Sequence, residues 1–117
     1  MKRYEEALQI AEQLGDLQGK AVRLNNIGLI HKAQGNYPEA LKRYEEALQI
    51  NEQLGNLSGK AVRINNIGWI YEAQGNYPKA LKMFEEALEI LTRLGLDKTA
   101  NANTFRKNIE YIKKKMS

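Results

Sequence analysis

The groups that could perform acid–base chemistry in this chain are one histidine, His31, and three pairs of adjacent glutamates. The pairs are Glu5-Glu6, Glu45-Glu46 and Glu85-Glu86. General acid–base catalysis needs such groups to meet in one pocket. His31 instead shares an apolar helical stripe with Leu24 and Gly28, and each pair lies on a helix flank. The lysine four residues before the second glutamate (Lys2, Lys42 or Lys82) can form a surface ion pair with it. We therefore expect a protein that is not an enzyme.

Other chemistry is also missing from the sequence. The chain has no cysteine, which excludes disulfides and thiol-based metal or redox sites. It has no cluster with metal-ligand spacing, no nucleophile motif and no glycine-rich phosphate loop. We predict no cofactor and no metal.

Two asparagine pairs, Asn25-Asn26 and Asn65-Asn66, stand where helices are expected. Asparagine is a poor residue for a helix interior, because its amide competes for backbone hydrogen bonds. The same amide offers a donor and an acceptor to a ligand. At 100° per residue, each pair lies on a stripe roughly opposite the apolar one.

We call this second stripe the asparagine stripe. It comprises Val22, Asn25, Asn26, Leu29 and Lys32, and in the following copy Val62, Asn65, Asn66, Trp69 and Glu72. It has two interpretations: the amides hydrogen-bond the backbone of a bound peptide, or each bonds a neighbouring helix and sets repeat geometry. Trp69 is likewise either an anchor for a ligand or a packing residue between repeats. We predict a peptide-binding groove built from these ten residues.

An internal repeat positions the stripe, because residues 1–40 and 41–80 are identical at 31 of 40 positions. Each copy holds two amphipathic helical patterns joined by short connections, so neighbouring helices must be antiparallel. We predict first helices at 17–34, 57–74 and 98–115, and second helices at 2–14, 38–54 and 78–94. Asp16 is expected to cap helix 17–34, and Pro38 to lie in the first turn of helix 38–54. Gly35 and Gly55 are expected to mark helix ends.

The spacing of Leu24, Ile27, Gly28, His31, Ala40, Tyr44 and Ala47 resembles the tetratricopeptide repeat. The 40-residue period is similar to the subclass found in kinesin light chains, Pins-type polarity adaptors and bacterial regulators. The resemblance implies an all-α solenoid of about six antiparallel helices in a right-handed superhelix. It also implies that the asparagine stripe lines the concave surface, with Asn26 and Asn66 the foremost peptide contacts. The glycines Gly28 and Gly68 are expected to let Ala40 and Ala80 approach, with Tyr44 and Phe84 between the layers.

The resemblance divides the chain into four parts. Residues 1–16 are a second helix without its first helix, 17–55 and 56–96 are repeats, and 97–117 form a capping helix. With the register shifted to 81 residues, Ala21 corresponds to Ala102 and Gly28 to Ile109. A polar outer face is typical of a terminal repeat element. The uncovered first segment favours a fragment of a longer array, or a chain that self-associates.

The net charge of +4 comes entirely from residues 97–117, which carry six basic and two acidic side chains. The rest is neutral, so the basic face of a nucleic-acid binder is absent. No apolar run approaches the roughly 20 residues of a membrane span. We predict a cytoplasmic protein–protein interaction scaffold that holds a protein or peptide ligand, with no membrane or nucleic-acid partner. The alternative is a self-assembling homo-oligomeric repeat array.

Overall fold

The computed structural model describes residues 5–9 and 16–117. Five helices of 17 residues each occupy the second range: α2 (Leu17–Ala33), α3 (Tyr37–Gln53), α4 (Leu57–Ala73), α5 (Tyr77–Arg93) and α6 (Ala100–Met116). Residues 5–9 are also helical, and no strand occurs in the described ranges. The all-α repeat fold is confirmed, and α2 to α6 begin and end within two residues of the predicted bounds. Most of the predicted helix 2–14 lies outside the described residues.

The helix ends have the local chemistry that the sequence predicts. The Asp16 carboxylate accepts a hydrogen bond of 2.8 Å from the Gly19 N–H and so caps α2. Pro38 lies in the first turn of α3, where its missing N–H costs nothing. Gly35 follows α2 with φ +76°, a left-handed conformation that glycine adopts without strain. The chain therefore reverses between helices within a few residues.

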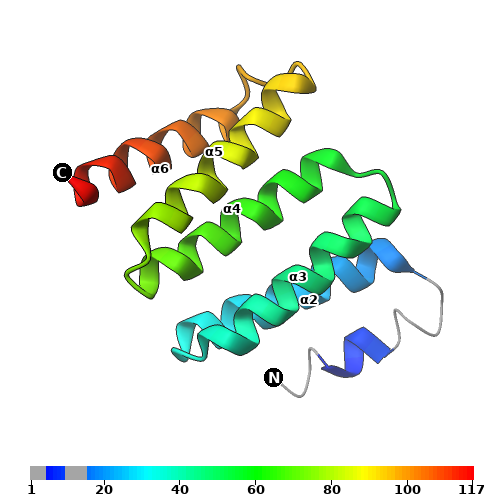
Figure 1. Ribbon diagram of the computed structural model, residues 1–117. Helices are drawn as coiled ribbons and strands as arrows, with labels where there is room; N and C mark the ends of the chain where they lie inside the picture. Colours follow the sequence, from blue (N-terminus) through cyan, green and yellow to red (C-terminus); the bar gives the residue numbers. More distant parts are fainter. Residues whose placement is uncertain (1–4, 10–15) are drawn as a thin grey trace. The chain divides into compact units, whose positions relative to one another are not determined.

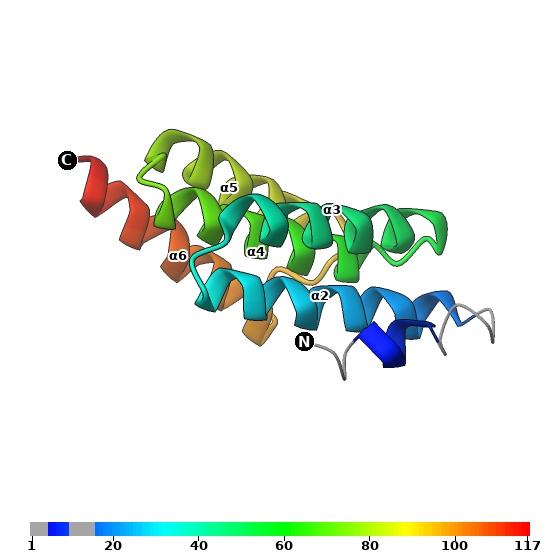
Figure 2. The ribbon, with the colours of Figure 1, turned by 90° about the horizontal axis from the view of Figure 1, so that it is seen from below.

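The chain divides into two compact units, Met1–Asn56 and Leu57–Ser117. In the first unit α2 packs antiparallel on α3, as Figures 1 and 2 show. A cluster of Ala21, Leu24, Ala47 and Ile50 forms its core, and Leu8 packs partly buried against it. Through Leu8, residues 5–9 contact the core of this helix pair.

The second unit contains three helices, with α5 packed against both α4 and α6 (Figure 1). Ala80, Phe84 and Ile112 form a buried cluster, against which Trp69 and Ile109 pack partly buried. This core therefore takes side chains from all three helices.

An aromatic ring facing a glycine sets how closely the two helices of each pair approach. A Cβ atom on Gly28 would lie 2.7 Å from a ring carbon of Tyr44, and one on Gly68 would lie 2.6 Å from a ring carbon of Phe84. Both rings are fully buried. The expectation that glycine accommodates the approach of Ala40 and Ala80 was thus incomplete. The nearest atoms belong to the aromatic rings, because a planar ring laid on a helix needs a surface without a Cβ.

One polar side chain interrupts the apolar stripe of α3. Asn51 is fully buried, and neither its Oδ1 nor its Nδ2 has a hydrogen-bond partner in the part of the chain that the structure describes. The residue 40 positions later is Leu91, which is also buried. A desolvated amide without a partner destabilises the folded state.

Replacing Gly68 with alanine should destabilise the protein. Alanine favours a helix by about 1 kcal/mol over glycine, but overpacking against the Phe84 ring costs about 1–3 kcal/mol. We expect a net loss of roughly 0–2 kcal/mol in the free energy of unfolding, measured by urea denaturation. In a Phe84→Leu background the same glycine substitution should cost little. An equal cost in both backgrounds would show that the ring is not the obstacle.

Replacing Asn51 with leucine should stabilise the protein by about 1–3 kcal/mol, because an unsatisfied amide is exchanged for an apolar group. Urea denaturation gives the change, and Leu91→Asn is the matched reverse substitution, expected to destabilise. A loss of stability in Asn51→Leu would mean that the amide is satisfied in solution.

Candidate functional site

The asparagine stripe of α2 is less buried than the face of the same helix that packs in the core. Ala21, Leu24, Ile27 and Gly28 are buried, whereas Val22, Asn25, Asn26 and Lys32 are half-buried. Leu29 is 47% exposed, the highest value among the exposed large hydrophobic side chains of the described chain. The stripe thus combines amide groups with accessible apolar surface, which suits contact with a peptide.

The stripe of α4 is partly covered by α6. Asn65 is 7% exposed, and its Oδ1 accepts a hydrogen bond of 2.9 Å from Nδ2 of Asn108, which is 8% exposed. This bond pairs the Asn108 donor with the Asn65 acceptor in a low-dielectric environment, where an unpaired amide would be costly. Asn65 therefore joins two helices in the structure, while Val62 and Asn66 remain half-buried on the same stripe.

Trp69 contacts α5 and α6, and Glu72 contacts α6. The Trp69 ring lies 5.0 Å from the Phe84 ring at 62°, an edge-to-face contact, and 5.7 Å from the Tyr111 ring. The Tyr111 hydroxyl donates to a carboxylate oxygen of Glu72 at 3.2 Å. Trp69 is still half-buried. Its packing between helices is observed, and the exposed part of the indole is what a ligand could touch.

The sequence analysis missed the residues of α6 that contact this stripe, Asn108 and Tyr111. Asn108 stands between the buried residues Phe105 and Ile112, at helical spacing from both. A polar residue on an apolar face was the signal that it needs a buried partner. Only the packing of α6 identifies that partner as Asn65.

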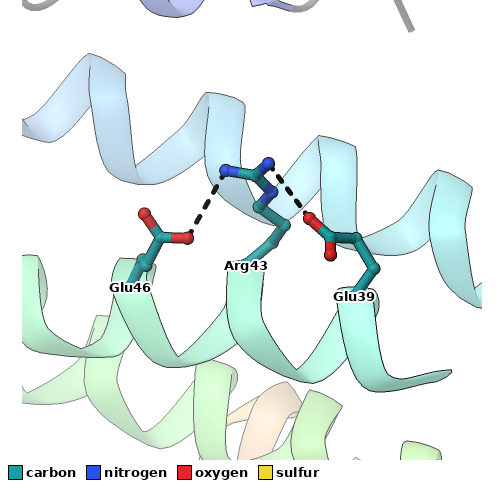
Figure 3. Close-up of polar contacts among 3 residues, drawn as sticks. All are labelled: Glu39, Arg43 and Glu46. Carbon is teal, nitrogen blue, oxygen red and sulfur yellow. Dashed lines mark hydrogen bonds and ion pairs between the residues drawn. The ribbon is translucent and has the colours of Figure 1, made fainter.

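One glutamate of the α3 pair takes part in an ion pair along its own helix. In α3, Arg43 lies between two glutamates, with Nη2 3.1 Å from Glu39 Oε1 and Nη1 3.4 Å from Glu46 Oε1 (Figure 3). The sequence had suggested Lys42 as the cation for Glu46, and the structure provides Arg43. The Nδ1 atom of the half-buried His31 has no hydrogen-bond partner among the described residues. These contacts fit a role in structure.

The described residues contain no group of three or more His, Asp or Glu side chains that could hold a metal ion. None of their helices has the length and apolarity needed to cross a bilayer.

Comparison with known proteins places this architecture in a family. A family model described as tetratricopeptide repeat matches residues 1–53 and 20–93. The chain belongs to the tetratricopeptide repeat family. It is similar to the crystal structure of BtubC (BKLC) from P. vanneervenii, with a TM-score of 0.80 and 28% identity. That similarity covers 95% of this chain and 46% of BtubC, so the chain spans about half of that protein.

No curated protein matches the chain. Tetratricopeptide repeats generally mediate protein–protein interaction or scaffolding and are typically non-catalytic.

The buried amide pair predicts a non-additive effect of mutation. Asn65→Ala or Asn108→Ala should each cost about 1–3 kcal/mol, because each leaves the other amide buried and unpaired. The double substitution should cost less than the sum of the two, as a double-mutant cycle with urea denaturation would measure. Asn66→Ala, one residue along, is the matched control and should change stability less. Additive costs at Asn65 and Asn108 would contradict a coupled pair.

Proposed function

We propose that this protein is an interaction module that binds a peptide or a segment of a partner protein on the asparagine stripe. The observation that carries the proposal is the surface of α2, where Asn25 and Asn26 lie half-buried beside the exposed Leu29. A solvated helix face is normally rich in charge, and this one presents amides and apolar groups instead. The family's general role in protein interaction supports the same conclusion.

The chemistry of the stripe favours recognition of a peptide backbone. Each asparagine amide can donate to a carbonyl and accept from an N–H, which every peptide offers whatever its sequence. Leu29 and Val22 add apolar contact, as Val62 does on α4. Each copy of the stripe suits an extended or helical segment whose side chains add specificity.

The two copies of the stripe differ in ways that would set specificity. Leu29 in α2 corresponds to Trp69 in α4, and Lys32 corresponds to Glu72. Glu72 accepts a hydrogen bond from Tyr111, so its charge is partly used within the protein. We propose Asn26 and Asn66 as the main backbone contacts, and Leu29, Lys32 and Trp69 as the residues that discriminate between ligands.

The test begins with selection of binding peptides from a random display library against the full chain. Affinity of the best peptide is then measured by fluorescence anisotropy for the double variant Asn26→Ala/Asn66→Ala. Loss of two amide contacts of about 1 kcal/mol each should weaken binding by roughly tenfold or more. The exposed Asn101 of α6 supplies a control, Asn101→Ala, which should bind as the unmodified protein does. Unchanged affinity in the double variant would remove the stripe from the account.

The second candidate function is self-assembly. Leu8, in the described range 5–9, is only partly buried against the first unit's core, and residues 2–14 repeat the sequence of the second helix α3 almost unchanged. Sedimentation velocity over a wide concentration range tests this. A monomer at the highest concentration would exclude it, and the peptide-binding proposal would stand.

A further inference from the structure

A second concave surface lies between α5 and α6, on side chains that the asparagine stripe does not use. It is an open groove with a volume of about 580 Å³. Leu88 of α5 and Ile109 of α6 are the apolar side chains that line it. Glu85 and Glu89 line it from α5, and Arg106 and Lys113 line it from α6. The residues of α6 that contact α4, Asn108 and Tyr111, are on a different face.

The chain itself shows what packs on such a surface. In both complete pairs, α2 with α3 and α4 with α5, a second helix packs on a first helix at a glycine. Helix α6 corresponds to a first helix, and Ile109 stands at the place of Gly28 and Gly68. Since Ile109 lines the cavity, the cavity lies where α6 would receive a helix of the second kind.

Ile109 changes which helix can fit. A Cβ atom at Gly68 would already lie 2.6 Å from the Phe84 ring, and isoleucine adds three more carbons there. A helix with Tyr or Phe at that point would clash, whereas one with Ala or Gly would lie against the isoleucine. The shape therefore selects a small residue.

The charges of the rim select a second property. Glu85, Glu86 and Glu89 place three carboxylates on the α5 side, next to Lys82. Glu89 also pairs with Arg93 of the same helix at 2.6 Å, so Glu85 and Glu86 supply most of the uncompensated negative charge. On the α6 side, Arg106 is held in place by donating to the Asp97 carbonyl at 2.5 Å and to Asn103 Oδ1 at 3.0 Å. An occupant with lysine or arginine along one flank would complement the acidic α5 wall.

We propose that the groove between α5 and α6 binds an amphipathic helix of a partner protein. This helix carries a small residue against Ile109 and a cationic flank against Glu85 and Glu89. Its apolar stripe packs on Leu88 and Ile109, as α5 packs on α4. The side chains that line the groove are different from those of the asparagine stripe.

The probe is a 17-residue peptide based on α3, Tyr37–Gln53, which is the chain's own second helix. It carries Tyr44→Ala to provide the small residue, and Glu39→Lys with Glu46→Lys to make the flank around Arg43 cationic (Figure 3). The matched peptide keeps Tyr44 and has the two lysine substitutions only. Binding of each labelled peptide to the full chain is followed by fluorescence anisotropy.

The unmodified protein should bind the alanine peptide about tenfold or more tightly than the tyrosine peptide, because overpacking is costly. The protein variant Ile109→Gly should remove or reverse this preference, since it places at position 109 the glycine that α2 has as Gly28 and α4 has as Gly68. Equal affinity of both peptides for the unmodified protein would overturn the proposal.

A second protein variant tests the proposal even if the Ile109→Gly protein does not fold. Glu85→Lys with Glu89→Lys changes two exposed side chains and should weaken the alanine peptide by about tenfold at low salt. Asn26→Ala/Asn66→Ala should leave this peptide's affinity unchanged. If the asparagine variant lost affinity for the peptide and the glutamate variant kept it, the peptide would bind on the stripe. That result would overturn the groove proposal and leave the proposed function standing.

Discussion

The contact between an aromatic ring and a glycine is the interaction on which each helix pair depends. Tyr44 lies over Gly28 and Phe84 over Gly68, with no room for a Cβ atom between them. Each ring is fully buried, so it contributes a large share of the apolar area removed from water. The contact fixes the separation of the helices, and that separation decides which side chains remain outside the core. The asparagine stripe is the surface left over by this packing.

Helix α6 shows what happens where the pattern changes. It keeps the buried residues of a first helix, Ala102 and Phe105, but carries Ile109 in place of the glycine. On its other face Asn108 bonds Asn65 and Tyr111 contacts Trp69. Helix α6 thus covers part of the asparagine stripe of α4 and forms one side of the groove with α5. Packing between α4 and α6 uses Asn65 and Trp69. The corresponding residues of α2, Asn25 and Leu29, are candidates for contact with a ligand.

Prediction from sequence succeeded where local chemistry or the repeat decides the outcome. Helix bounds followed from Asp16, Pro38 and the glycines, because caps and turns act through neighbouring residues. The pairing of antiparallel helices followed from short connections. Prediction of the site was weaker. The partner of Asn65, the contacts of Trp69 and the absence of a partner for the Asn51 amide among the described residues depend on other helices. Spacing along one helix carries no information about them.

The sequence by itself therefore determined the helices, the 40-residue period, the buried and outer faces, and the family. These properties arise from propensity, capping and hydrophobic periodicity, which are read within a few turns of chain. Only the tertiary structure decided which asparagine is used internally, which side chains the glycines accommodate, and that an open groove runs between α5 and α6. Those outcomes depend on the distances between side chains of different helices, and a change of one methyl group at Gly68 or Ile109 is enough to alter them.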